Sequence, residues 1–273
     1  APAAYALPIL VAGTEEQKRA LLPPVVEGDW KPYASAFVEP NLDFAPAEMR
    51  TTAARSNGSY VLNGVKTMVP FAAQAAGLLV YASLDGKTQA FVVPPGSAGL
   101  KVGDREAWCG LNALPTHRLT LEGVKVPADA RLGGESGHDA QLLIAATQTA
   151  TAALAIGLAR AAYEYALAYA KDRTVFGTAI AQKQSIAFML AEMAPDIEAI
   201  RLLAWEAAWL LDQGKDAAQA ALMAVLGGAD CAMMVTDRAV QILGGHGYIR
   251  EHPVERWMRN GRGVPSFPGL AMV

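Results

Sequence analysis

A glycine pair near the C-terminal end of the chain carries residue types that could bind a polar ligand. Gly244 and Gly245 follow a long Ala-rich run that reads as a helix, and Gln241 stands just before them. Glycine has no side chain, so the backbone can turn here, or a ligand or a second chain can approach it closely. A helix end and the amide of Gln241 could therefore face one polar ligand together. The same residues also suit a plain helix ending between two packed helices.

A second glycine turn combines a cation with an aromatic ring. Arg173 and Phe176 precede Gly177 at the junction between two helical runs, and Gln184 stands just inside the second run. Arginine can hold a phosphate by charge, and phenylalanine can stack on an aromatic ring. Taken alone, an arginine at the negative end of a helix dipole is an ordinary helix ending. His246, inside the sequence GGHGY, could approach a phosphate, but a turn histidine satisfied by the backbone is an equal alternative.

Three long runs with the composition of helices position these turns. They cover residues 141–171, 181–211 and 217–243, and a shorter helix is expected after Pro253. Small residues lie on several faces of the first run, which suits close burial between helices. Pro195 should kink the second run, because proline removes one helical hydrogen bond. We therefore predict a helical bundle, with surfaces on which subunits could also pack.

The middle of the chain reads as a β domain. Between Tyr33 and Val126, short alternating runs are separated by turn dipeptides, and Asn57-Gly58 and Asp85-Gly86 are strong hairpin signals. Prolines mark the boundaries of the runs. The predicted strands cover residues 51–56, 59–62, 78–83, 88–93, 117–121 and 124–126.

Residues 1–30 read as the end of a helical segment. Thr14 and Gln17 form a capping-box pattern, and apolar residues recur at helical spacing as far as Val26. A single helix cannot bury its own apolar face. It needs a covering surface, which we expect to be missing from this chain.

Composition and charge argue against several classes of function. The 273 residues carry a formal net charge of −3 without a basic cluster, so nucleic acid is not an expected partner. Cys109 and Cys231 lie far apart and share no ligand spacing with the four histidines, so neither a disulfide framework nor a metal site is expected. No run reads as a membrane span or a signal peptide. We therefore expect a cytoplasmic protein without membrane contact.

In combination, these motifs resemble those of the acyl-CoA dehydrogenase family of flavoproteins. The pattern YxxxRxxFG covers Tyr169–Gly177, and the patterns QxxGGxGY and PxER lie within Gln241–Arg256. Three further segments fall in the family's order: FVEP at Phe37–Pro40, Gly-x-Lys at Gly64–Lys66 and LEGVKVP at Leu121–Pro127.

The resemblance implies an α+β fold with three parts. Residues 31–132 would form a middle antiparallel β domain of barrel or sandwich type, and residues 133–273 a C-terminal four-helix bundle. Residues 1–30 would be the remnant of an N-terminal helical domain that is otherwise missing. Relatives assemble as dimers or tetramers, so the same is expected here.

The resemblance also implies FAD as cofactor, held between two subunits. One subunit's bundle clasps the diphosphate and the adenine, and its residues match here by type and order: Arg173, Phe176, Gln184, Gln241, Gly244 and Gly245. The flavin pocket of the other subunit comes from the β domain, and this half departs from the pattern. Val38 replaces a threonine that bonds the flavin, while Met68 and Pro70 replace a tryptophan and a threonine. Backbone amides near Phe37 and Val38 could still serve.

The carboxylate base of the family is missing from its two usual positions. In relatives a glutamate removes the α-proton of an acyl-CoA thioester, which requires a carboxylate within hydrogen-bond reach. Pro268, before Gly269, occupies the commoner position of this base, and Thr147 occupies the alternative position. Neither side chain can act as a carboxylate base, so the catalytic residue stays unassigned.

Three interpretations follow from this pattern. The first is an FAD-dependent dehydrogenase that desaturates an acyl-CoA between its α and β carbons. The second is a partner subunit without chemistry of its own, which completes the FAD site of a second dehydrogenase-like chain. The third is a related flavin oxidase or monooxygenase. Flavin content and bleaching by acyl-CoA separate the first two, and oxygen consumption identifies the third.

Overall fold

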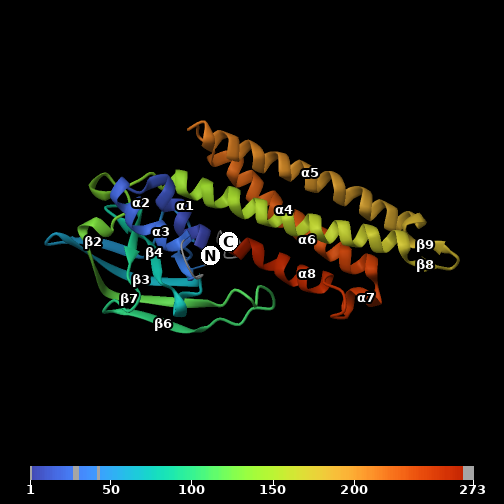
Figure 1. The fold of residues 1–273 in the computed structure, drawn as a ribbon, viewed down its shortest axis with the longest axis horizontal. Coiled ribbons are helices and arrows are strands. Elements are labelled where there is room, and N and C mark those ends of the chain that lie inside the picture. Colours follow the sequence, from blue (N-terminus) through green and yellow to red (C-terminus); the bar gives the residue numbers. More distant parts are fainter. Residues whose placement is uncertain (1, 27–30, 42–43, 267–273) are drawn as a thin grey trace. The chain divides into compact units, whose positions relative to one another are not determined.

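The chain folds into two compact units. The computed structural model describes residues 2–26, 31–41 and 44–266 (Figure 1). The first, here called the β unit, contains the described residues up to Trp108 together with Asn112–Thr147. The second, the helical unit, contains Cys109–Leu111 and Gln148–Ser266. The three-part division at residues 30 and 132 stays a prediction.

The β unit is built on a mixed seven-stranded sheet. Its strands run in the order β1-β4-β2-β3-β7-β6, and β5 pairs with β4. The pairings of β2 with β3, β3 with β7, β4 with β5 and β6 with β7 are antiparallel, whereas β1 and β2 each run parallel to β4. The strands are β1 (Tyr33–Ala36), β2 (Thr52–Ser56), β3 (Ser59–Pro70), β4 (Gly77–Leu84), β5 (Lys87–Val93), β6 (Leu100–Arg105) and β7 (Thr116–Pro127).

The predicted strands between residues 51 and 93 are bounded by turn dipeptides that the structure confirms as hairpin turns. Asn57-Gly58 joins β2 to β3 and Asp85-Gly86 joins β4 to β5, and all four residues have positive φ, as a two-residue hairpin turn requires. The two strands predicted at 117–121 and 124–126 form one strand, β7, and β3 is longer than predicted. The short strands β1 and β6 were missed, since neither shows an alternating pattern bounded by turn dipeptides.

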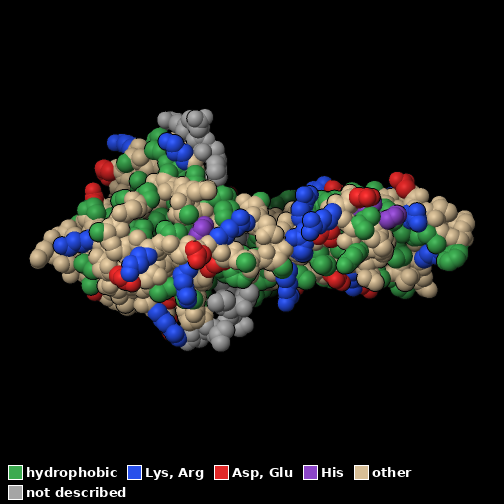
Figure 2. Space-filling model, turned by 90° about the horizontal axis from the view of Figure 1, so that it is seen from below, with side chains coloured by type: hydrophobic (Ala, Val, Ile, Leu, Met, Phe, Trp, Pro, Cys, Tyr) green, Lys and Arg blue, Asp and Glu red, His purple; other side chains and the backbone are tan. Residues whose placement is uncertain are grey.

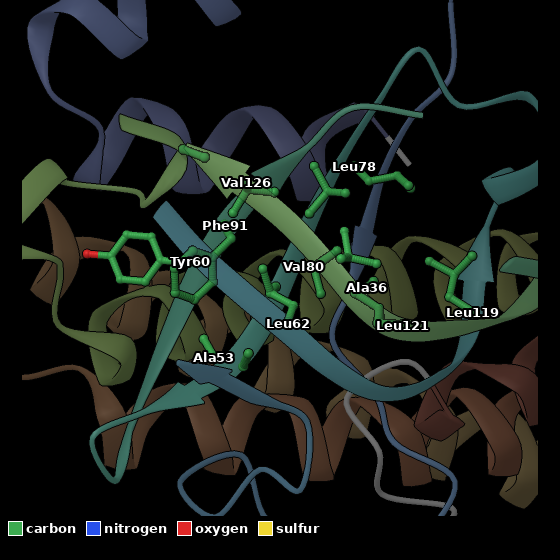
Figure 3. Packing of buried hydrophobic residues seen from close by; sticks show 14 of the residues in the cluster. Ala36, Ala53, Tyr60, Leu62, Leu78, Val80, Phe91, Leu119, Leu121 and Val126 are labelled. Atoms are coloured by element: carbon green, nitrogen blue, oxygen red, sulfur yellow. The ribbon is translucent and has the colours of Figure 1, made fainter. Parts of the chain in front are cut away.

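The core of the sheet is made of aromatic and branched side chains from adjacent strands. The ring of Tyr60 in β3 makes an edge contact with Phe91 of β5, with ring centroids 5.1 Å apart, and both lie in one buried cluster with Leu62 of β3 and Val80 of β4 (Figure 3). Leucine and valine side chains of β7 complete this cluster. Buried apolar area of this kind is the main favourable term in folding.

Three N-terminal helices pack on a second apolar cluster of the β unit. They are α1 (Pro2–Ala12), α2 (Glu15–Leu21) and α3 (Pro23–Val26). Thr14 and Gln17 form the predicted capping box. Tyr5 and Ile9 of α1 are fully buried in this cluster, beside Leu79 and Tyr81 of β4.

The expectation that the helix at residues 14–26 finds no cover in this chain is therefore wrong. Its Leu21, Leu22 and Val25 pack partly buried against the same cluster. A lone helix cannot cover its own apolar face, but in the folded chain the apolar surface of β4 and its neighbours covers it.

The helical unit consists of three long helices, a small hairpin and two short helices. Its elements are α4 (Ala140–Asp172), of which the residues up to Thr147 belong to the β unit, β8 (Thr174–Val175), β9 (Thr178–Ala179), α5 (Gln184–Asp212), α6 (Ala218–Leu243), α7 (Gly245–Tyr248) and α8 (Val254–Gly263). Small residues allow close packing: a Cβ added at Gly228 of α6 would lie 3.4 Å from the Cβ of Ala155 in α4. α5 continues through Pro195 as one helix, so the predicted kink does not end it.

Two helices of the described chain, α4 and α6, are long and apolar enough to cross a membrane by length and composition alone. The expectation that no run has this character is therefore wrong, because alanine and larger aliphatic residues dominate both helices. Such helices are weak evidence of a membrane span, since core helices of bundles pass the same test, and 39% and 44% of the two apolar stretches are buried. Positive and negative side chains are interspersed over the face seen in Figure 2.

Candidate functional site

The turn between β8 and β9 exposes an aromatic ring. Val175 pairs with Thr178, so Phe176 and Gly177 form a two-residue hairpin turn in which both residues have positive φ, +54° and +78°. Such turns favour Asn-Gly or Asp-Gly, because a bulky side chain is strained in this conformation. The turns Asn57-Gly58 and Asp85-Gly86 of the seven-stranded sheet follow this preference, but the turn between β8 and β9 carries phenylalanine.

Packing within the chain does not stabilise the Phe176 ring in this position. Phe176 is 93% exposed, so it buries almost no apolar surface. Arg173, at the end of α4, is also exposed. A strained, exposed aromatic residue beside an exposed cation indicates a role in contacts with a ligand or another chain.

The glycine pair at the end of α6 forms a second exposed backbone edge. Gly244 has φ +57° and ψ −127°, and its amide donates to the carbonyls of Val240 and Gln241, both at 3.1 Å. This conformation accounts for a glycine at position 244. Gly245 lacks a positive φ, and a Cβ added at either glycine would meet no atom within 4 Å. Nothing inside the chain therefore requires the missing side chain of Gly245.

One hydrogen bond joins these two edges of the helical unit. The hydroxyl of Tyr169 in α4 lies 2.6 Å from Nδ1 of His246 in α7. Tyr169 is one helical turn before Arg173, whose amide donates to the Tyr169 carbonyl at 2.8 Å. Gly245 is adjacent to His246. The histidine is therefore satisfied by a tyrosine side chain, and this contact places the turn sequences GGHG and RTVFG at the same end of the helical unit, here called the corner.

Gln184 and Gln241 belong to the same end of the helical unit. α5 and α6 run antiparallel, as the contacts of Glu192 with Arg238 and of Ile200 with Gly227 show. The start of α5 therefore lies at the end of α6. Both glutamines are exposed. Figure 1 shows the β8–β9 hairpin and α7 at this end of the three long helices.

This corner can bind an anionic group attached to a flat ring. Arg173 supplies a positive charge, Phe176 supplies a free ring face, and Gly245 leaves room for close approach to the backbone. The exposed amides of Gln184 and Gln241 can donate and accept hydrogen bonds.

The residues predicted on the flavin side lie in the β unit, and their side chains are used in packing. Val38 and Met68 are only 4% and 7% exposed. The ring of Phe37 makes edge contacts with Phe44 and Tyr81 at centroid distances of 5.5 and 5.1 Å. The carbonyl of Val38 accepts from the amide of Thr67 at 3.0 Å. This contact brings the segment 37–38 next to β3 near Met68.

Met68 stands in a bulge of β3 with φ +56°. Its amide donates to the Glu106 carboxylate at 3.1 Å, and the hydroxyl of Thr67 lies 2.6 Å from the same carboxylate. Sequence reasoning missed Glu106, because a single acidic residue that follows a strand carries no recognisable spacing. The structure thus places a carboxylate directly on the bulge.

A buried ion pair holds the segment after Val38 against β3. The ammonium of Lys66 lies 2.9 Å from Oε1 of Glu39 and donates to the Phe37 carbonyl at 3.1 Å. Exposure of the two side chains is 0% and 2%. The amides of Arg50 and Thr51 donate to the Glu39 carboxylate at 2.7 and 2.8 Å. Both charged residues lie in the sequence motifs FVEP and Gly-x-Lys, but their pairing could not be read from the spacing.

Burial and charge act against each other on this pair. Burial lowers the pKa of Lys66 to about 8, although the Glu39 charge and hydrogen bond oppose this shift. Burial raises the pKa of Glu39, but the Lys66 charge and the hydrogen bonds to the carboxylate outweigh it, so this pKa lies below its ordinary value. Both residues are therefore charged at neutral pH.

Of the two positions expected for the base, only Thr147 lies within the described residues. Thr147 lies in α4, and its hydroxyl donates to the Leu143 carbonyl at 2.9 Å. Pro268 lies outside the described residues. No carboxylate is assigned as base.

Comparison with known proteins agrees with these features along nearly the whole chain. Residues 34–124 match the acyl-CoA dehydrogenase middle domain, and residues 139–269 match the acyl-CoA dehydrogenase C-terminal domain. The caffeyl-CoA reductase-Etf complex subunit CarC of Acetobacterium woodii is 37% identical, over 97% of this chain and 72% of its own length.

Solved structures show the same fold. Butyryl-CoA dehydrogenase from Megasphaera elsdenii superposes with a TM-score of 0.86 and 36% identity, over 97% of this chain and 71% of its own. PigA, solved with FAD and proline, superposes with a TM-score of 0.87 and 29% identity, over 98% of this chain and 72% of its own. The predicted fold of a β domain followed by a helical bundle is confirmed, with a sheet that is mixed rather than wholly antiparallel. The chain is a member of the acyl-CoA dehydrogenase family.

Proposed function

We propose that this chain is an FAD-dependent oxidoreductase that desaturates an acyl-CoA thioester between its α and β carbons. The observation that carries the proposal is the exposed corner formed by Arg173, Phe176, Gly245 and the two glutamines. A strained, exposed phenylalanine next to an open glycine edge supports a ligand that enters from outside the chain. Relatives of similar sequence include short-chain acyl-CoA dehydrogenases, which supports the substrate class.

The residues of the corner fit the adenosine diphosphate part of FAD. Arg173 would pair with the diphosphate, since guanidinium and phosphate match in charge and in hydrogen-bond geometry. Phe176 would stack on the adenine, and the backbone at Gly244–Gly245 would approach the diphosphate closely. When bound, the flavin would accept the two electrons that desaturation releases. Because the corner is exposed, its cofactor would extend to a neighbouring subunit, so we infer a dimer or tetramer.

A second candidate function is that of a partner subunit that completes the FAD site of another dehydrogenase-like chain. Three observations favour it. Val38 and Met68 present buried apolar side chains on the flavin side, and Pro268 stands where relatives carry the base. CarC, a relative of this chain, is itself a subunit of a complex. In this case the corner would bind FAD whose flavin and base belong to the other chain.

The visible spectrum of the purified chain separates the candidates. A stoichiometric flavin band that bleaches when butyryl-CoA is added without oxygen supports a dehydrogenase that works alone. A chain that purifies without flavin, but retains FAD when mixed with a second dehydrogenase-like chain, supports the partner subunit. Bleaching followed by steady oxygen consumption in air identifies an oxidase instead.

Arg173→Ala is the matched variant for this experiment. It should lose FAD while its far-UV circular dichroism and melting temperature stay unchanged, because the side chain is exposed and makes no core contact. Lys171→Ala, an exposed cation two residues earlier, is the control and should retain FAD. Equal flavin content in both variants would contradict the proposed cofactor site.

A further inference from the structure

Two tyrosines of α4 and two histidines near α7 form a compact cluster in the helical unit. Tyr165 and Tyr169 lie one helical turn apart. Their hydroxyls contact Nδ1 of His252 at 2.8 Å and Nδ1 of His246 at 2.6 Å. The two imidazole rings are stacked with centroids 5.4 Å apart. Trp257 of α8 makes an edge contact with Tyr165 at 5.7 Å.

This cluster is built as a unit. The ring of Tyr169 contacts both imidazoles edge-on, at centroid distances of 5.9 and 5.8 Å. Stacked and edge-on aromatic pairs add to the hydrogen bonds in fixing the geometry. All four tyrosine and histidine side chains are half-buried, so each hydrogen bond is partly shielded from water. The cluster therefore restrains the segment from His246 to His252 against α4.

The cluster stands between the two edges of the proposed FAD corner. On one side, the Tyr169 carbonyl accepts the amide of Arg173 at 2.8 Å, so Arg173 is bonded to the last turn of α4. On the other side, His246 follows Gly245 directly in the short helix α7. Gly247 packs closely on α6, since an added Cβ would lie 2.3 Å from the Val240 carbonyl oxygen. The position of Gly245 relative to Arg173 is thus set by α6 from one side and by the Tyr169–His246 contact from the other.

We propose that Tyr169 and His246 are positioning residues for FAD: their hydrogen bond holds Arg173 and the Gly244–Gly245 backbone as one preformed binding surface. This inference rests on the proposed function, because it concerns the same corner. Preformed contacts lower the entropic cost of binding, so loss of the bond should weaken binding more than it destabilises the fold. Neither side chain needs to touch the cofactor.

Tyr169→Phe tests the inference, because it removes the hydroxyl and keeps the ring. The dissociation constant of FAD, measured by titration of the apoprotein, should rise roughly fivefold, as expected for one partly buried hydrogen bond. The melting temperature of the apoprotein should stay near that of the wild type. Tyr163→Phe, a half-buried tyrosine of the same helix outside the cluster, is the matched control and should leave the dissociation constant unchanged.

Two variants of His246 separate positioning from simple packing. His246→Leu fills space but cannot bond Tyr169, so it should weaken FAD binding as Tyr169→Phe does. His246→Asn places an amide near the position of Nδ1 and should restore most of the affinity. A double variant of Tyr169→Phe and His246→Leu should be no weaker than either single variant, because both remove the same bond.

The outcomes distinguish this inference from the function on which it rests. A wild-type chain that binds no FAD, alone or with a second dehydrogenase-like chain, overturns the proposed function. A wild-type chain that binds FAD, together with Tyr169→Phe of equal affinity, overturns only the positioning role. A Tyr169→Phe variant that loses affinity only in step with a lower melting temperature also overturns it, as does failure of His246→Asn to exceed His246→Leu.

Discussion

Phe176→Asn should make the protein more stable and a poorer binder of FAD. Phe176 is the first residue of a two-residue hairpin turn and has φ +54°. Asparagine tolerates this conformation, and Asn-Gly is a preferred sequence for such a turn. The chain itself shows the preference, because Asn57-Gly58 and Asp85-Gly86 occupy the equivalent turns.

The magnitude follows from two terms. A bulky side chain in the left-handed region costs roughly 1–2 kcal/mol, and asparagine relieves most of this cost because its short polar side chain can hydrogen-bond locally. The loss of buried apolar surface is small, since Phe176 is 93% exposed. The net gain is about 1 kcal/mol, which corresponds to a rise of about 2–4 °C in melting temperature for a protein of this size. Loss of one ring that stacks on a base costs roughly 1–3 kcal/mol of binding, or about 5- to 150-fold in affinity.

Thermal unfolding of the apoprotein and titration with FAD measure the two effects separately. The matched control is Asn57→Phe, which places phenylalanine at the equivalent position of an exposed turn, with φ +44°. This change should lower stability by about 1 kcal/mol and leave FAD affinity unchanged. Together the two variants compare the same pair of residues in opposite directions.

Two results would refute the reasoning. A lower melting temperature of Phe176→Asn would mean that the ring makes stabilising contacts within the folded chain. Wild-type FAD affinity of the same variant would mean that the ring is not part of the cofactor site. Either result also removes the main reason for treating the turn as a site.

Three further predictions concern the glycine edge and the buried ion pair. Gly245→Ala should leave stability unchanged or raise it by about 0.5 kcal/mol, since Gly245 has no positive φ. The same change should weaken FAD binding in titrations. Wild-type affinity for FAD would show that the cofactor does not approach this glycine closely. Lys66→Met should lower the free energy of unfolding, measured in urea, by about 3–5 kcal/mol, because the Glu39 carboxylate stays buried without its partner. Adding Glu39→Gln to this variant should recover most of the lost stability. The pKa of Glu39 is lower in the folded than in the unfolded chain, so the Glu39 carboxylate stabilises the folded state fully above pH 4.5. This stabilisation is lost as pH falls through the folded pKa. The urea midpoint of the wild type should therefore drop over this pH range, and that of the double variant should drop less.

Features that depend on a few neighbouring residues could be predicted from the sequence. The turns at Asn57-Gly58 and Asp85-Gly86, the capping box at Thr14 and the three long helices all follow from local pattern. β1 could not be predicted in this way. Its residues pair in parallel with β4, more than forty positions later, and a strand of four residues shows too little periodicity.

The contacts that build the candidate site are the least predictable part. Tyr169 and His246 are 77 residues apart, and Lys66 and Glu39 are 27 apart. No spacing rule links such residues, because the packing of whole helices and strands brings them together. The residue types at the corner could be predicted from motifs, but the hydrogen bond that joins its edges required the structure.

The two halves of the proposed site differ in how strongly they indicate a ligand. The strain at Phe176 indicates one, whereas the buried apolar residues on the flavin side do not. A turn that would be more stable with asparagine keeps phenylalanine, and Gly245 keeps no side chain although nothing in the chain fills its place. Both features are explained if a ligand or subunit contacts this corner. Val38 and Met68, in contrast, need no ligand to explain them, since both are packed inside the β unit. The corner is therefore the stronger evidence for cofactor binding, and whether this chain also holds the flavin depends on backbone groups near Val38 and Met68 that spectroscopy of the isolated chain can test.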